Sequence, residues 1–167
     1  MYRHLLDRLI RIVGKHENWS LLVVTQHTGI LEQLLPLVKE GRLQTVYSPD
    51  SEKGISYTIR AGIEAAEAQK AEKCAFFVAD QPYLKEKTAE DFLKYMENAT
   101  AALGCVFCGG DSGNPAWFSK PYFSELERLS GDCGGKKVLK QHLKSLIPFP
   151  IEDEQELKDL DRKEDLR

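Results

Sequence analysis

Apolar residues along this chain recur at two different spacings. Between residues 2 and 13 they stand three and four positions apart, which predicts an amphipathic helix that ends at Gly14. Elsewhere short unbroken apolar runs, such as LLVVT at 21–25, are typical of strands that are buried on both faces. The helices predicted in this way span residues 2–13, 30–38, 54–66, 88–98, 122–129 and 136–145. The predicted strands span residues 21–25, 44–48, 74–79, 101–108, 116–118 and 146–151.

Proline and capping residues set several of the predicted boundaries. Pro36 is expected to kink or shorten the second helix, because proline lacks the N–H that the helix needs. Thr88 with Asp91 resembles a capping box and predicts a helix start at Thr88. Pro148 and Pro150 confine the last strand to an edge or irregular position, since they cannot donate to a ladder.

Strand and helix patterns alternate along the chain, and this order predicts an α/β fold. Three layers are expected, α/β/α, around a mostly parallel sheet with helices on both faces. The 167 residues, 42% of them hydrophobic and 29% charged, suit a single domain over residues 1–167. Four cysteines are too few to cross-link a chain of this length by disulfides, so we expect reduced thiols.

Charge and hydropathy exclude several classes of protein. The net charge of −3 offers no basic face for nucleic acid, so we expect no nucleic-acid partner. No apolar run approaches the roughly 20 residues that span a bilayer, so we expect no membrane partner. Charges interrupt the first apolar stretch, which is therefore unlike a signal peptide, and we expect a cytoplasmic protein.

Asp80 is the principal chemical candidate. It ends the apolar run 74–79, and Gln81 and Pro82 stop that run directly after it. The carboxyl ends of strands in open α/β sheets are where ligands bind. A carboxylate at that place can bind Mg²⁺, which takes one or two carboxylates and leaves its other positions to water and phosphate oxygens. The alternative is that Asp80 caps the turn that follows the strand.

Six stretches in order resemble the molybdenum-cofactor (MobA-like) nucleotidyltransferases, most closely the molybdopterin cytidylyltransferase branch. None of the six is diagnostic alone, but their order along nearly the whole chain is fairly specific. The resemblance implies a Rossmann-like, glycosyltransferase-A-like nucleotidyltransferase fold. The stretches are VVTQH (23–27), YSPDSEKGISYTIRAG (47–62), ADQP (79–82), GNPAWF (113–118), GDCGGKKVL (131–139) and DLDRKED (159–165).

The resemblance also implies roles for five residues. Asp80 and Asp161 are the expected catalytic carboxylates and the ligands of Mg²⁺, while Gly54 and Ser56 are expected beside the nucleotide, and Asn114 beside the pterin or its phosphate. Besides Asp80, three of them have a structural alternative. Asp161 suits a solvated terminal charge, Ser56 an ordinary helix cap, and Asn114 a residue that only makes its turn.

The expected reaction is Mg²⁺-dependent transfer of a nucleotidyl group, cytidylyl by resemblance, from CTP or GTP to molybdopterin, a phosphorylated pterin. Family members begin with a strand and a glycine-rich loop that wraps the triphosphate, and neither is present in this sequence. We therefore expect an N-terminally truncated fold that lacks roughly 25 to 30 residues, one strand and its loop. Two alternatives follow: a non-catalytic relative that binds a nucleotide or a partner protein, and a transferase for another phosphorylated metabolite. An exposed sheet edge also predicts a homo-oligomer.

Overall fold

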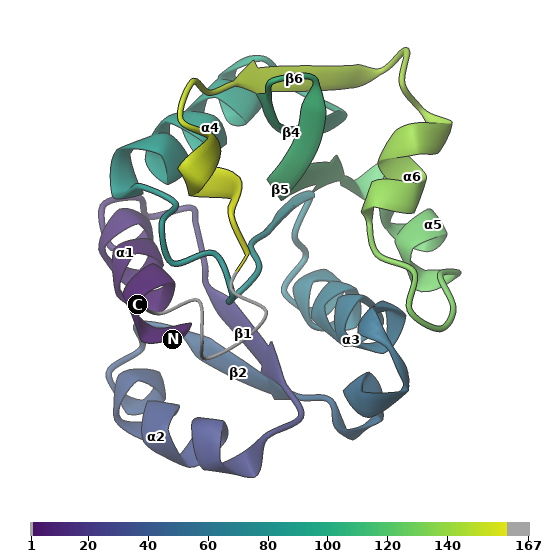
Figure 1. Ribbon diagram of the computed structural model, residues 1–167. Helices are drawn as coiled ribbons and strands as arrows, with labels where there is room; N and C mark the ends of the chain where they lie inside the picture. Colours follow the sequence, from purple (N-terminus) through teal and green to yellow (C-terminus); the bar gives the residue numbers. More distant parts are fainter. Residues whose placement is uncertain (1, 160–167) are drawn as a thin grey trace.

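The computed structural model describes residues 2–159 of the chain (Figure 1). Its α-helices are α1 (Tyr2–Val13), α2 (Thr28–Lys39), α3 (Ile55–Ala68), α4 (Glu86–Asn98), α5 (Phe123–Glu127) and α6 (Lys136–Gln141). Its strands are β1 (Leu22–Thr25), β2 (Gln44–Tyr47), β3 (Lys73–Phe76), β4 (Leu103–Cys108), β5 (Asp111–Ser119) and β6 (Leu146–Pro150). Three 3₁₀ turns complete it, η1 (Pro49–Lys53), η2 (Lys120–Tyr122) and η3 (Glu154–Leu157). The predicted α/β fold is confirmed.

The strands form two sheets. In the first, β1 and β2 pair in parallel, with Leu22 opposite Gln44. In the second, four strands lie in the order β3-β5-β4-β6, in which β5 is antiparallel to both of its neighbours and β6 is parallel to β4. β6 is an edge strand, as its two prolines predict.

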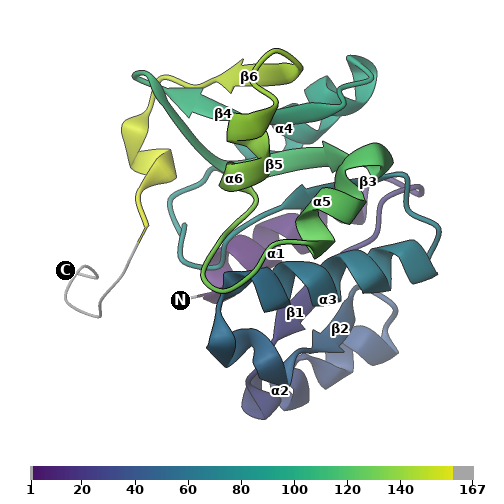
Figure 2. The same ribbon diagram turned by 90° about the vertical axis from the view of Figure 1, so that its right-hand side faces the viewer.

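Helices cover both faces of the two sheets (Figures 1 and 2). On one face α1 and α4 share a core cluster that includes Leu9 and Phe92. On the other face α3, α5 and α6 share a cluster that includes Ile63 and Phe118. A third cluster joins α1 and α2 to β1 through Ile10 and Leu34. Within residues 2–159, no helix is long and apolar enough to cross a membrane.

Two of the signals that were expected to set helix boundaries are wrong. The capping box at Thr88 is wrong, since α4 begins at Glu86 and its N-cap residue is Lys85. The Lys85 N–H donates instead to Glu156 Oε2 at 2.9 Å, so a distant carboxylate fixes this boundary. The shortening at Pro36 is also wrong. That proline lies in the last turn of α2, which continues to Lys39, and its carbonyl accepts the N–H of Glu40.

Several elements differ from the prediction in length. β3 ends at Phe76, so the predicted run 77–79 and Asp80 lie in the connection after it. β5 is longer than the predicted segment 116–118, because it pairs with β3 on one side and β4 on the other. The helices predicted at 122–129 and 136–145 are the shorter α5 and α6.

Candidate active site at the carboxyl ends of the strands

Asp80 lies in a turn that follows β3 and is partly buried. Arg8 of α1 holds the residues after it, since its Nη1 atom donates to the carbonyl oxygens of Pro82 and Leu84, each at 2.6 Å. A guanidinium that binds two backbone carbonyls restricts the loop more than one neutral hydrogen bond does. The first helix therefore positions the segment that carries Asp80.

Gln81 connects this turn to the C-terminal segment. Its side chain is buried, and its Nε2 atom donates to Asp159 Oδ1 at 2.9 Å and to the Leu157 carbonyl oxygen at 3.4 Å. Lys85 adds an ion pair between its Nζ and Asp153 Oδ2 at 2.7 Å, which lowers the pKa of the Asp153 carboxyl. Residues 153–159 are thus held against the ADQP turn.

The residues at this position fit a divalent cation by their chemistry. Asp159 accepts a hydrogen bond from Gln81, which directly follows Asp80, so the carboxylates of Asp80 and Asp159 stand on adjoining segments. Such oxygen donors suit Mg²⁺ or Mn²⁺. Asp161, the second predicted ligand, lies outside the described residues. Among the residues that are described, no group of three or more His, Cys, Asp or Glu side chains gathers as a metal cluster.

Gly54 and Ser56 lie at the start of α3, which packs directly on the loop 131–135. Gly54 has φ +137°, and a Cβ there would stand 2.2 Å from the Gly131 carbonyl oxygen, so only glycine fits. The buried Ser56 donates from Oγ to that same oxygen at 2.7 Å. The Ile55 N–H points at Asp132 Oδ1, 3.5 Å away. These contacts fix the loop at the helix start.

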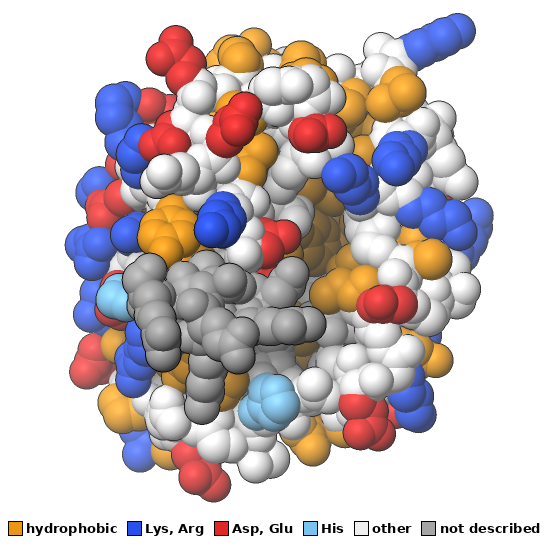
Figure 3. All heavy atoms as spheres, viewed as in Figure 1, with side chains coloured by type: hydrophobic (Ala, Val, Ile, Leu, Met, Phe, Trp, Pro, Cys, Tyr) orange, Lys and Arg blue, Asp and Glu red, His pale blue; other side chains and the backbone are white. Residues whose placement is uncertain are grey.

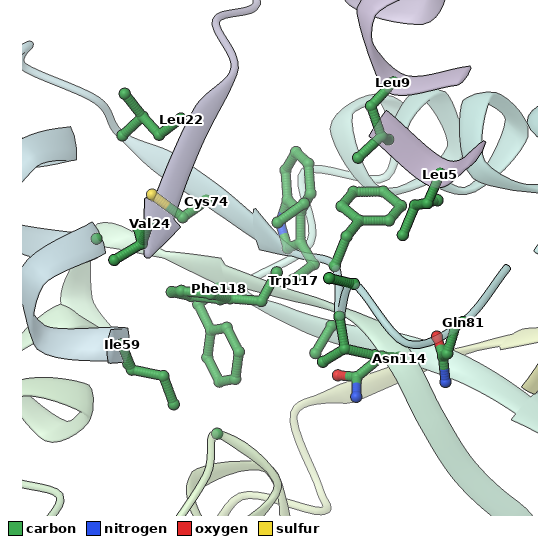
Figure 4. Close-up of a pocket in the computed structure, with 18 of the residues that line it drawn as sticks. Leu5, Leu9, Leu22, Val24, Ile59, Cys74, Gln81, Asn114, Trp117 and Phe118 are labelled. Carbon is green, nitrogen blue, oxygen red and sulfur yellow. The ribbon is translucent and has the colours of Figure 1, made fainter. Parts of the chain in front are cut away.

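Asn114 lies on β5 near the carboxyl end of β3, because Phe76 is the last residue of β3 and stands opposite Ala116. The Asn114–Pro115 peptide is cis. In Figure 4 the amides of Asn114 and Gln81 lie at the same end of a cavity. The structure therefore brings the predicted residue Asn114 together with the residue that follows Asp80.

The cavity has a polar end and an apolar part. The polar end carries Asn114 and Gln81. The lining of the whole cavity also includes the polar residues Thr25, His27, Lys136, Lys158 and Asp159. The apolar part lies between β1 and β3 and is lined by side chains such as Leu22 and Phe76. Figure 3 shows the face of the molecule hollowed here, with hydrophobic side chains deep in the hollow. Ligands of α/β sheets bind at such carboxyl ends.

Comparison with known proteins gives the family. The family described as MobA-like NTP transferase domain matches residues 2–146 of this chain. The chain belongs to the MobA-like NTP transferase domain family. Proteins of this nucleotidyltransferase type act on a nucleoside triphosphate and typically use a divalent metal.

Relatives of this MobA-like chain support the fold. The purine catabolism protein PucB of Bacillus subtilis (strain 168) is 27% identical over 117 residues, which are 70% of this chain and 56% of PucB. The chain thus spans little more than half the length of that relative. The structure of Rv0371c from Mycobacterium tuberculosis H37Rv has a TM-score of 0.73 and 19% identity, over 99% of this chain and 80% of that one. A manganese complex of the same protein has a TM-score of 0.63 with 19% identity, over 91% and 76% of the two chains.

A second kind of neighbour is 4-diphosphocytidyl-2C-methyl-D-erythritol synthase. Its structure has a TM-score of 0.65 and 15% identity, over 96% of this chain and 84% of that one. At these identities the likeness shows the shared fold of the MobA-like domain.

Sequence reasoning missed the residues that hold the MobA-like site together. Arg8, Gln81 and Glu156 each act on a partner more than 70 positions away. The sequence around each of them does not indicate these long-range contacts, because each has the character of an ordinary polar residue. The one available clue is that Gln81 follows Asp80 directly within the ADQP motif.

Proposed function

We propose that this chain transfers a nucleotidyl group, the cytidylyl group of CTP, to molybdopterin with Mg²⁺ bound at Asp80 and Asp161. The observation that carries this proposal is the hydrogen bond from Gln81 to Asp159, which holds Asp159, the first residue of the acidic stretch DLDRKED, beside the ADQP turn. The match to the MobA-like family over residues 2–146 supports the reaction class.

The reaction needs little covalent chemistry from the protein. A phosphate oxygen of the acceptor attacks the α-phosphorus of the nucleotide, the bond to the β-phosphate oxygen breaks, and pyrophosphate leaves with that electron pair. Catalysis is then mainly positioning and charge balance. Bound Mg²⁺ would supply charge neutralisation at the phosphates.

The chain's own residues divide the site between two substrates. Gly54 and Ser56 would shape the nucleotide side, since their contacts with Gly131 fix the loop at the start of α3. Asn114, at the polar end of the cavity, would bind the pterin or its phosphate. Lys136 and Lys158, which also line the cavity, add positive charge that suits anionic substrates.

The acceptor is the less constrained half of this proposal. The resemblance of the six stretches to the molybdopterin cytidylyltransferase branch is what favours a molybdenum-cofactor pterin. The neighbour named 4-diphosphocytidyl-2C-methyl-D-erythritol synthase shares the fold, and its name gives a product built on another phosphorylated metabolite. Trials with an isoprenoid or sugar phosphate as acceptor distinguish these two substrate classes.

A second candidate function is binding without turnover. Within residues 2–159, no glycine-rich turn that follows a strand carries both an arginine and a lysine. Such a turn supplies the N–H groups and cations that stabilise a departing pyrophosphate, and one missing donor typically costs about 10²–10³ in rate. A chain with the metal and acceptor residues alone would bind a nucleotide and release no pyrophosphate.

Pyrophosphate release separates the two candidates. The protein is incubated with CTP or GTP, Mg²⁺ and molybdopterin, and the variant Asp80→Asn is compared with Asp91→Asn, which changes an exposed carboxylate of α4. We expect product from the wild-type chain and from Asp91→Asn, and a loss of about 10²–10³-fold in Asp80→Asn. Nucleotide binding without any pyrophosphate would overturn the transferase and leave the binding protein.

A further inference from the structure

The stretches 47–62 and 131–139 meet through one face of α3. Ser56 and Arg60 stand four positions apart on that helix, so their side chains project from the same face. Ser56 binds the loop 131–135 at Gly131, and Arg60 binds the chain just before it, at the end of α5. Figures 1 and 2 show α5 and the loop after it beside α3. One helix face therefore contacts both the end of α5 and the start of the loop.

Arg60 binds the end of α5 through two backbone carbonyls. Its Nε atom donates to the Glu127 carbonyl oxygen at 3.1 Å, and its Nη2 atom donates to the Leu129 carbonyl oxygen at 3.0 Å. The last carbonyls of a helix have no partner within the helix and carry partial negative charge, so a cation suits this position. The Arg60 Cζ atom also lies 5.3 Å from the centroid of the Tyr57 ring, which restricts the guanidinium further. Arg60 thus serves the backbone of a distant segment.

The loop 131–135 is held at both of its ends. At its start, Ser56 Oγ donates to the Gly131 carbonyl oxygen at 2.7 Å, directly after the segment that Arg60 binds. At its end, a Cβ on Gly135 would stand 3.0 Å from Phe118 Cζ, so the loop packs closely on β5. The sequence between these contacts is rich in glycine and would sample many conformations if either end were released.

Lys136 directly follows this loop and lines the cavity, as Gly134 and Gly135 do. Other exposed lysines, such as Lys53 and Lys87, pair with a nearby carboxylate, whereas Lys136 has no such partner within residues 2–159. An ammonium group in a cavity wall that no carboxylate neutralises can donate to an anionic group of a ligand. The place of Lys136 depends on the loop before it.

We propose that Lys136 binds a phosphate group of the nucleotide, and that Arg60 is a positioning residue that sets the place of Lys136 through the backbone of residues 127–135. This inference rests on the proposed function, since it adds a cation for the phosphates that Asp80 and Mg²⁺ bind there. The loop packs on the start of α3, which is the nucleotide side of the proposed site. Arg60 itself contacts backbone and not substrate.

The variant Arg60→Lys separates positioning from simple attraction. It keeps the positive charge, but an ammonium group lacks the rigid fork with which a guanidinium binds two carbonyls at once. If Arg60 acts through the loop, Arg60→Lys loses affinity for the nucleotide. If Arg60 only attracts the nucleotide by its charge, Arg60→Lys loses none.

Calorimetric titration of CTP with Mg²⁺ into single and double variants tests the proposal. We expect Lys136→Met to bind at least about tenfold more weakly than the wild-type chain, as for the loss of a charge-assisted hydrogen bond. Arg60→Lys should bind about threefold to tenfold more weakly, and should cause less than about a twofold further loss when it is added to Lys136→Met. Lys137→Met and Arg42→Lys change exposed residues and should bind as the wild-type chain does.

Hydrogen exchange measures the positioning without any substrate. The N–H groups of Lys137 and Leu139 donate to carbonyls of the loop, so their exchange reports whether the loop and the first turn of α6 keep their arrangement. We expect both amides to exchange at least about tenfold faster in Arg60→Lys, and the Ala99 amide at the end of α4 to stay unchanged. If Arg60→Lys does not fold, Arg60→Gln, which can still donate to one carbonyl, takes its place in both measurements.

The possible results separate this inference from the proposed function. Equal affinity in Lys136→Met and the wild-type chain would overturn the role of Lys136 and leave the Asp80 site intact. Losses that multiply in the double variant would overturn the positioning role, because Arg60 would then act independently of Lys136, and so would unchanged exchange in Arg60→Lys. A wild-type chain that bound no CTP would overturn the proposed function together with the role of Lys136, while faster exchange in Arg60→Lys would still show that Arg60 holds the loop.

Discussion

Gln81 and Asp159 are joined by a hydrogen bond across 78 positions of the chain, with Gln81 Nε2 lying 2.9 Å from Asp159 Oδ1. The donor is almost fully buried, and it sits next to Asp80 in the ADQP motif. Together with the contacts of Lys85 to Asp153 and Glu156, this hydrogen bond sets the distance between the turn after β3 and residues 153–159. The metal chemistry that we propose depends on that distance being kept.

Replacing Gln81 by Met should separate the two segments. The apolar side chain keeps the volume but cannot donate to Asp159, so we expect a stability loss of about 1 kcal/mol by urea unfolding. Faster hydrogen exchange at residues 157–159 should accompany it. Gln155→Met, at an exposed position in η3, is the matched control and should change neither quantity. Equal exchange in both variants would show that Gln81 does not hold this segment.

Gly54→Ala should be strongly destabilising. A Cβ at this position would stand 2.2 Å from the Gly131 carbonyl oxygen, and φ +137° is a strained conformation for alanine. We expect a loss of at least about 2 kcal/mol in the free energy of unfolding. Gly29→Ala in α2 is the control, since nothing lies within 4 Å of its added Cβ. Alanine should stabilise that helix by about 0.5 kcal/mol, and two similar losses would contradict the account.

The pH dependence of stability should report the cluster around Glu90. Lys94 Nζ and Lys15 Nζ lie 2.9 and 3.0 Å from its carboxylate oxygens, and mainly these two lower the pKa of Glu90 to about 2, with a smaller contribution from His16. A carboxylate with a lowered folded pKa stabilises the protein above its unfolded pKa of about 4.5 and loses this contribution as the pH falls towards 2.

The variant Glu90→Gln isolates this contribution from those of other carboxylates. Its urea midpoint should lie below that of the wild-type protein at pH 6, and the two midpoints should converge between pH 4.5 and pH 2. A difference that stays constant over that range would mean that the ionised carboxylate does not account for the stabilisation.

Local patterns predicted the elements, while distant contacts decided much of the site. The helical spacing of α1 and the apolar run of β1 placed those two elements closely, whereas the apolar run at 74–79 located β3 but not its end at Phe76. The direction of β5 was not predictable in this way, since it depends on pairing with β3 and β4 at the same time. The start of α4 was misplaced for the same reason, because Glu156 binds the Lys85 N–H from 71 positions away.

Of the predicted site residues, Asn114 lies with Gln81 in one cavity, and Gly54 and Ser56 pack together on Gly131. Asp161 lies outside the described residues. The sequence identified the ADQP turn by resemblance, but it gave no sign that Gln81 would bind Asp159, since side-chain pairing over such separations follows from the folded arrangement alone. The catalytic and metal-binding roles stay predictions.

The central claim is that Asp80 binds a nucleoside triphosphate through a divalent cation, and calorimetry tests it most directly. CTP is titrated into the wild-type chain, Asp80→Asn and Asp91→Asn, each with Mg²⁺ and with EDTA. We predict binding that requires Mg²⁺ in the wild-type chain and in Asp91→Asn, and an affinity at least about tenfold weaker in Asp80→Asn. Binding of equal strength in Asp80→Asn, or binding that does not depend on Mg²⁺, would contradict the claim.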